Sequence, residues 1–591
     1  MPQWLRHQLF IVAVAVPVLF VQLGTARLWD RDEPRNAQCA VEMSQRADWV
    51  VPVFNDELRA HKPVLLYWLI MSAYAVFGVN EFAARFWSAA LGVATVLCTY
   101  HLGARLFNRT AGLWAALSLA PALMFAVASR AATPDAPLIF CVTAALCAYV
   151  QFAFPASSSV DGTPRFPQSL MGGLVIHGLV ALAVLAKGPV GFVLPAAIIG
   201  LSLWMTRVFS LSGLFTAANP HDTPTETRFY LRVGFTAPLK NLWTLIIELQ
   251  PLTSLAMLLI VALPWYAWVG WRTNGEFLVG FLWDHNVRRA TESMEGHSGP
   301  AILFYPLTLM IGFFPASVFL LPALLDARRQ LNVSSRQTAA IVFCVTWIVV
   351  VIGLFSVAKT KLPSYVTPCY PALAVLVGSL LERWTARKLA ISSHWLRLSV
   401  AVNVLVGIVA VVAVYVLAGR YLPGEQWLAA IGLVLIAGGG VALYCEWRQH
   451  SSLRAATISL GSGLLFSCLA FGLIPAAADR HQQSHELLAA VRDRAPTEIA
   501  ALRCLEPSWV FYLGRPIRQV EEADEAAAFL AQNDRLLIVC DDDYASLAGR
   551  LPPDVQVLHR TPRFLRSETL LVLGRTHTSL AEKPNTESHP K

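Results

Sequence analysis

The feature that most constrains this chain is a series of long apolar segments separated by short polar connections. In a bilayer, a segment must satisfy its own backbone N–H and C=O groups, which a helix of about 20 residues does. Thirteen candidate spans centre near Val16, Val93, Leu119, Ala145, Ala181, Ala197, Leu259, Met310, Thr346, Ala374, Ile408, Val434 and Leu464. The sequence therefore predicts an all-α polytopic membrane domain over residues 1–477. The shorter apolar stretch Val64–Phe77 is expected to be interfacial or re-entrant.

Composition supports this prediction. Hydrophobic residues make up 56% and charged residues 14% of the 591 residues, whereas soluble proteins carry about 25% charged residues. The formal net charge of +8 comes from Lys and Arg in short clusters between apolar segments. Because the positive-inside rule accounts for such clusters, no nucleic-acid partner is expected. The lack of a convincing cleavage site before Asp32 indicates that Leu9–Leu23 is retained as the first helix.

The basic clusters predict the orientation in the membrane. A cytoplasmic N-terminus places these basic groups inside: Arg105 with Arg109, Arg207 through Lys240, Arg328 with Arg329 and Arg336, Arg383 through Lys388, and Arg448 with Arg454. It leaves these residues outside: Asp32, Lys62, Asp135, Lys187, His285, Arg288, Lys359 and Lys361. Basic residues that break the positive-inside rule on one face indicate an anionic ligand there.

A polar outer loop, residues 27–63, combines acidic and basic side chains between apolar segments. Asp32 and Glu33 are adjacent carboxylates, Arg35 follows them, and Lys62 lies near the end of the loop. A carboxylate suits a general base, and Arg with Lys suits a phosphate. The alternative is a solvated loop whose charges terminate helices, since Asp32 before Pro34 fits a helix N-cap.

Three motifs of this loop resemble a known family. They are Asp32–Arg35 (DEPR), Asp48–Pro52 (DWVVP) and Lys62–Trp68 (KPVLLYW). Together they resemble the first external loop of aminoarabinose transferases and protein O-mannosyltransferases, which are GT-C membrane glycosyltransferases using polyprenyl-phosphate sugars. The resemblance extends to about residue 475. It implies a GT-C-like fold in a bacterial inner membrane and inverting transfer of a sugar to a lipid A, protein or glycan acceptor outside.

The resemblance also assigns the acidic residues. Asp32 matches the position expected to deprotonate the acceptor hydroxyl, and Glu33 is expected to be its structural neighbour. Asp135, in Thr133–Pro137, resembles the second acidic position, which helps to hold the acceptor or a basic partner. The alternative role of Asp135 is to cap the helix that begins at Ala136.

Basic residues are the candidates for holding the donor phosphate, whose charge grows as its bond to the sugar breaks. Lys62 and Arg288 match family positions, Arg35 belongs to the first loop, and Arg289 is included by proximity. For one residue of the Arg288–Arg289 pair the alternative is snorkelling to lipid headgroups.

Lys359, Lys361 and Tyr365 resemble the family's Lys-Leu-Pro-x-Tyr segment, where helix N-terminal amides beside two Lys would suit an anion. The turn Ala186–Pro189 resembles another outer turn of the family, with an expected structural role.

His285 raises the question of a metal. It resembles the family's acidic-His-x-x-Arg motif, and in some members this His and an acidic residue before the loop Lys hold a metal. Here the acidic position is His61. Two His side chains could bind zinc, but this departure leads us to expect no required cofactor, with a divalent metal such as zinc as the alternative.

The composition becomes soluble from about Ala478. Expected helices at 485–494 and 524–532 alternate with expected strands at 498–504, 535–540, 555–559 and 569–573. This pattern predicts a small α/β domain over 478–575 on the outer side, followed by a disordered tail at 576–591. Cys504 and Cys540 lie in expected strands, where a disulfide and buried free thiols both fit. Residues 207–250 are expected to be a cytoplasmic linker, with an amphipathic surface segment as the alternative.

Two other functions compete with an enzyme. A lipid or glycolipid transporter or flippase would also collect charge between spans, but such proteins usually show repeated halves and broken helices at the midplane. Here no repeat is visible and the charges gather at one face. A non-catalytic assembly subunit would not need Asp32, Arg35 and Lys62 together. The sequence leaves the sugar, the acceptor and the oligomeric state open.

Overall fold

The computed structural model describes residues 2–29, 31–154, 164–211, 243–288, 303–331 and 335–575. Two compact units divide the chain. We call Met1–Arg27 with Cys39–Ala477 the membrane unit, and Leu28–Gln38 with Ala478–Lys591 the C-terminal unit. Most of the expected linker at 207–250 and all of the expected tail at 576–591 lie outside the described residues.

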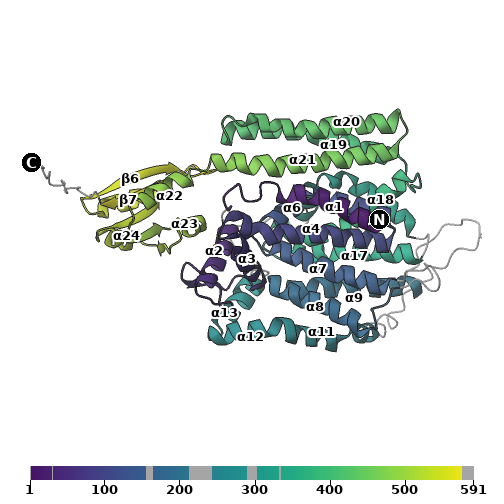
Figure 1. The fold of residues 1–591 in the computed structure, drawn as a ribbon, viewed down its shortest axis with the longest axis horizontal. Helices are drawn as coiled ribbons and strands as arrows, with labels where there is room; N and C mark the ends of the chain where they lie inside the picture. The colour runs from purple at the N-terminus through teal and green to yellow at the C-terminus, as the bar shows by residue number, and fades with distance from the viewer. Residues whose placement is uncertain are drawn as a thin grey trace, which may run out of the picture. The chain divides into compact units, whose positions relative to one another are not determined.

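The membrane unit is a bundle of helices (Figure 1). Its first half contains α1 (Gln3–Phe20), α2 (Asp32–Gln45, which begins in the C-terminal unit), the hairpin β1 (Val53–Phe54) and β2 (Glu57–Leu58), α3 (Leu65–Phe77), α4 (Glu81–Leu106), α5 (Arg109–Leu119), α6 (Leu123–Arg130), α7 (Asp135–Ala153), α8 (Leu170–Lys187) and α9 (Val190–Leu211).

The second half of the bundle contains α11 (Pro251–Met257), η1 (Leu258–Ala262), α12 (Leu263–Arg272), α13 (Glu276–Leu278), η2 (Val279–Arg288), α15 (Phe304–Gly312), η3 (Ala316–Phe319), α16 (Leu320–Gln330), α17 (Ser335–Val357), η4 (Pro363–Cys369), α18 (Tyr370–Thr385), α19 (His394–Tyr421), η5 (Gln426–Gly432), α20 (Leu433–Trp447) and α21 (Ser452–Arg480).

The predicted spans are recovered. Among the described residues, eleven helices are long and apolar enough to cross a membrane, and two bent pairs raise the number to thirteen if each pair is one span. The pair α5–α6 bends by 70° and the pair α15–α16 by 115°. Pro121 and Pro315 lie at these bends, where proline cannot supply a helical N–H. The protein is therefore a multi-pass membrane protein, and α3, with 13 residues, is the short apolar helix that was expected.

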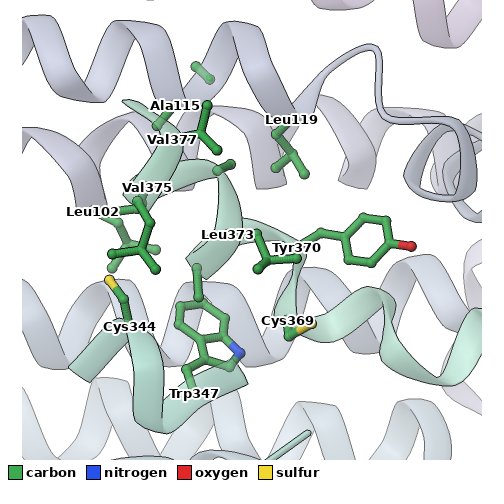
Figure 2. Close-up of a cluster of buried hydrophobic side chains, with 14 of the residues drawn as sticks. Leu102, Ala115, Leu119, Cys344, Trp347, Cys369, Tyr370, Leu373, Val375 and Val377 are labelled. Carbon is green, nitrogen blue, oxygen red and sulfur yellow. The ribbon is translucent and has the colours of Figure 1, made fainter. Parts of the chain in front are cut away.

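The core of the membrane unit is built around α18. Figure 2 shows this cluster, which includes Leu102, Ala115, Leu119, Cys344, Trp347, Cys369, Tyr370, Leu373, Val375 and Val377. The indole Nε1 of Trp347 donates to the carbonyl of Pro368 at 2.8 Å, which joins α17 to η4. A Cβ at Gly378 would collide with the carbonyl oxygen of Ala111. Small residues thus let α18 approach α5 closely, and this packing fixes the segment between α17 and α18.

The C-terminal unit is an α/β domain, as predicted. Its sheet has the order β4-β3-β5-β7-β6, with β3 parallel to β4 and β5, and antiparallel pairing of β7 with β5 and β6. The strands are β3 (Glu498–Leu502), β4 (Arg518–Val520), β5 (Arg535–Cys540), β6 (Val555–Pro562) and β7 (Thr569–Arg575). The helices are α22 (Ser484–Asp493), α23 (Pro507–Leu513), α24 (Ala523–Leu530), α25 (Asp541–Leu547) and the single turn η6 (Ala548–Arg550). The sequence analysis missed β4, α23 and α25, which are too short to show a periodic pattern.

Candidate active site

Asp135 and Lys187 form an ion pair at one end of the bundle. Asp135 is the first residue of α7, and Lys187 is the last residue of α8, where Gly188 ends the helix at a positive φ of 79°. The two helices pack against each other in opposite directions, so these ends meet. Their side chains are only 16% and 17% exposed. Lys187, expected only in a structural turn, is thus the basic partner of Asp135.

Two further segments reach this ion pair. The Ser364 hydroxyl hydrogen-bonds the Asp135 carboxylate, and the Lys62 ammonium lies close enough to stabilise its charge. The ammonium of Lys187 also lies 5.2 Å from the ring centroid of Tyr365, within range of a cation–π interaction. Two cations therefore share one carboxylate, and we call Lys62, Asp135, Lys187, Ser364 and Tyr365 the outer cluster. Two neighbouring ammonium groups suit an anionic group such as a phosphate.

Lys361 does not fit its expected role in phosphate binding. Its Nζ donates to the carbonyls of Phe355, Ser356 and Ala358 at 3.2, 2.6 and 2.6 Å. These hydrogen bonds use all three ammonium protons and satisfy carbonyls at the end of α17. The side chain is buried, and burial lowers the pKa of its ammonium. Lys361 is therefore a helix cap, whereas Lys359 is exposed.

The first outer loop is held by a carboxylate that the sequence analysis gave no role. Asp48 accepts backbone N–H groups of Val50 at 3.0 Å and Val51 at 3.3 Å, and pairs with Arg272 Nη1 at 2.8 Å. Trp265 Nε1 donates to the Val50 carbonyl at 3.0 Å. These contacts fasten the loop to α12. The sequence alone could have suggested the role of Asp48 within its turn, because an Asp side chain commonly accepts the backbone N–H two residues later. It could not have suggested the ion pair with Arg272.

The same loop is stiffened at its hairpin. Asn55 and Asp56 connect β1 to β2 with φ values of 59° and 62°, which a two-residue primed turn requires. Glu42 accepts the N–H groups of both residues, at 2.9 and 3.4 Å. Arg59 Nε then donates to the Tyr67 hydroxyl at 3.2 Å. The chain leading to His61 and Lys62 is thus positioned by hydrogen bonds on both sides of the hairpin.

Asp32, Glu33 and Arg35 lie in the first turn of α2, within the C-terminal unit. The Asp32 side chain is exposed, whereas Glu33 Oε2 accepts the N–H of Trp29 at 2.8 Å. The Leu28 N–H donates to the hydroxyl of Tyr512 at 2.8 Å. Glu33 therefore organises the chain before α2, whereas the Asp32 carboxylate is exposed. Arg35, three residues later, lies on the same face of the helix.

The rings of His61 and His285 lie together, with centroids 3.9 Å apart and planes inclined by 31°. The nitrogen lone pairs lie in the ring planes, and two planes inclined by 31° at rings 3.9 Å apart do not meet within a metal–nitrogen bond length of both rings. No group of three or more metal-ligating side chains occurs within the described ranges. The zinc alternative therefore does not fit this pair. Arg288 is exposed at the end of η2, and Arg289 lies outside the described residues.

Comparisons with known proteins found similar sequences. Residues 8–275 match the family model described as dolichyl-phosphate-mannose-protein mannosyltransferase. An uncharacterised protein of Aquifex aeolicus is 28% identical over 383 residues, covering 64% of either chain. The undecaprenyl phosphate-alpha-4-amino-4-deoxy-L-arabinose arabinosyl transferase of Edwardsiella ictaluri is 27% identical over 470 residues, covering 77% of this chain and 74% of the relative. This chain thus spans roughly two thirds to three quarters of the length of these relatives.

Solved structures show the same fold. The crystal structure of ArnT from Cupriavidus metallidurans bound to undecaprenyl phosphate has a TM-score of 0.74 at 22% identity, covering 95% of this chain and 97% of that chain. The apo oligosaccharyltransferase of Archaeoglobus fulgidus has a TM-score of 0.50 at 13% identity, covering 93% and 71%. The GT-C-like fold implied by the first-loop motifs is therefore confirmed.

Proposed function

We propose that this chain is a membrane glycosyltransferase of the GT-C class that transfers a sugar from a polyprenyl-phosphate donor to a lipid A, protein or glycan acceptor. The observation that carries this proposal is the outer cluster, in which the ammonium groups of Lys62 and Lys187 both lie near the carboxylate of Asp135. Charged side chains that are largely buried are costly to desolvate, and such groups gather at functional sites. A lipid phosphate is the ligand that such a cationic site fits.

The proposed reaction is a single displacement with inversion. The acceptor hydroxyl gives its proton to the Asp32 carboxylate as its oxygen forms a bond to the anomeric carbon. The bond between that carbon and the phosphate oxygen breaks on the opposite face, and polyprenyl phosphate leaves with an added negative charge. Preorganised cations around the phosphate stabilise this developing charge, so they lower the energy of the transition state more than that of the bound donor.

Lys62 is the proposed first contact of the phosphate, with Arg35 and Arg288 as further cations. Asp135 positions the two ammonium groups of the outer cluster and limits their mutual repulsion. Glu33 and Lys361 support the local backbone instead, because their side chains hydrogen-bond main-chain groups. No step is assigned to a metal, since the stacked rings of His61 and His285 do not converge on an ion.

The donor follows from the relatives. The Edwardsiella protein is named for an undecaprenyl-phosphate aminoarabinose donor, and the Cupriavidus structure contains undecaprenyl phosphate. We infer the same class of lipid carrier for this chain. A flippase fits less well, because the charged residues of the outer cluster gather at the ends of α7 and α8 rather than midway along the spans.

We infer that the N-terminus is cytoplasmic and that the C-terminal unit and outer cluster are on the outer side of a bacterial inner membrane. The basic residues between spans support this orientation through the positive-inside rule. A reporter fused after Lys388 should be active inside, and one fused after Pro475 should be active outside. Activity of both fusions on one side would refute the orientation.

The test of function compares envelope glycolipids and glycoproteins of a deletion strain with those of its parent by mass spectrometry. Wild-type protein should restore the missing sugar, whereas Asp32→Asn should lower its transfer by roughly 10² or more. Glu57→Gln is the matched control, because Glu57 is also an exposed carboxylate of the first outer loop. Full complementation by Asp32→Asn at equal protein level would remove Asp32 as the base. Identical profiles of deletion strain and parent would refute the transferase proposal.

A further inference from the structure

A second group of charged residues lies at the other end of the membrane unit. α7 starts at Asp135 in the outer cluster and runs for 19 residues, or about 28 Å. Near its far end, the carbonyl of Gln151 accepts a hydrogen bond from Arg105 Nη2 at 3.0 Å. Arg105 is thus separated from the candidate active site by the length of one span.

Arg105 lines a cavity of about 550 Å³. The cavity is formed where α4, α16 and α18 end and where α5 and α17 begin. Its charged and amide lining includes Arg105, Arg109, Gln330, Arg336, Glu382 and Arg383. The volume is within the range of small-ligand sites. Because it lies at the ends of spans, the cavity is at the level where lipid headgroups begin.

Positive charge is in excess in this cavity. Arg383 Nε pairs with Asp326 Oδ2 at 3.1 Å, so its charge is balanced. Arg105, Arg109 and Arg336 have no carboxylate partner among the residues that the structure describes. Glu382 is the one carboxylate in the lining. Arg336 Nη2 donates to the Arg105 carbonyl at 2.8 Å, which brings two like charges together instead of separating them.

Two of the buried lining atoms that lack a hydrogen-bond partner in the described chain are of opposite kind. They are Arg105 Nε, a donor, and Gln330 Oε1, an acceptor. The amide nitrogen of Gln330 donates to Asp326 Oδ2. The amide oxygen of Gln330 is therefore the atom without a hydrogen-bond partner. Buried polar atoms are usually satisfied. A ligand with an anionic oxygen for the arginines and a hydroxyl for Gln330 would satisfy both.

We propose that this cavity binds the headgroup of an anionic glycerophospholipid carrying a phosphodiester and an unesterified hydroxyl. Guanidinium groups bind phosphate oxygens in a planar, two-pronged geometry. The N-terminus of α5, capped by Asn108 beside Arg109, adds the positive end of a helix dipole. The positive-inside rule alone explains basic residues at this face, but it does not require several arginines without a carboxylate partner around a cavity that also holds a buried amide oxygen without a donor. The proposal is independent of the sugar-transfer reaction.

The experiment measures lipid retention by native mass spectrometry of the full-length protein released from detergent. The probes are phosphatidylglycerol, phosphatidylcholine, which has no hydroxyl and no net charge, and soluble glycerol 3-phosphate as competitor. We expect wild-type protein to retain phosphatidylglycerol preferentially. Arg109→Gln with Arg336→Gln should weaken retention about tenfold or more, since charge-assisted hydrogen bonds are lost. Arg448→Gln is the matched control, an exposed arginine outside the cavity lining.

Each result bears on the proposal. Arg109→Gln alone should also weaken retention, and its exposed side chain has no partner in the described chain whose loss would disturb folding. Equal retention by the cavity variants and by Arg448→Gln would overturn the site. Equal retention of phosphatidylcholine would overturn the headgroup assignment. Full displacement by glycerol 3-phosphate would show a site for free phosphate instead of a lipid.

Discussion

The ion pair between Asp135 and Lys187 gives the sharpest test of the outer cluster. We consider Asp135→Asn, which keeps the shape of the side chain and an oxygen for Ser364 but removes the negative charge. Lys62 and Lys187 would then repel each other without a carboxylate between them. Because the side chains are only 16% and 17% exposed, the change resembles breaking a buried pair more than a surface one.

The magnitude follows from that burial. Removing one partner of a fully buried pair costs about 3–5 kcal/mol, and an exposed pair contributes about 0–1 kcal/mol. For this largely buried pair we expect Asp135→Asn to lower the free energy of unfolding by about 2–3 kcal/mol. Lys187→Met should have a similar effect, because it leaves the Asp135 carboxylate buried with less compensation.

The double variant separates stability from function. Asp135→Asn with Lys187→Met should destabilise the protein by less than the sum of the single changes, with a coupling of roughly 1–3 kcal/mol. Sugar transfer should stay low, because the double variant lacks a cation of the outer cluster. The assay is denaturant unfolding in detergent followed by tryptophan fluorescence, alongside turnover at fixed protein amount. Additive single effects would refute the pairing, and full turnover of the double variant would refute its role at the donor.

Three other predictions concern neighbouring groups. Lys62→Ala should weaken binding of undecaprenyl phosphate by about ten- to a hundredfold in a lipid titration. Lys361→Ala should lower the stability of the protein with little effect on this affinity. Weakened binding by Lys361→Ala with unchanged binding by Lys62→Ala would instead identify Lys361 as the phosphate ligand. Asp48→Ala should lower turnover and speed proteolysis of the first outer loop, because the contact to α12 is lost; unchanged turnover and cleavage would remove its positioning role. Cys504 and Cys540 are buried free thiols, so thiol labelling of denatured protein should be equal before and after reduction; an increase after reduction would indicate a disulfide.

The sequence predicted those features that depend on local composition. Apolar length decides whether a segment can span a bilayer, so the thirteen spans could be counted without knowing how they pack. The alternation of helix and strand patterns after Ala478 predicted the α/β domain for the same reason. The motifs DEPR, DWVVP and KPVLLYW pointed to the family because each is a continuous stretch.

Tertiary structure decided which charges meet. Asp135 and Lys187 are 52 residues apart and Asp48 and Arg272 are 224 apart, and no local pattern says which helix ends become neighbours. For the same reason Lys361 appeared to be a ligand in the sequence, although the fold turns its ammonium back onto the carbonyls of α17. Packing of small residues, such as Gly378 against α5, lets helices that are distant in the sequence approach closely. Local composition therefore determined the elements, and the packing of distant helices determined the chemistry of their ends.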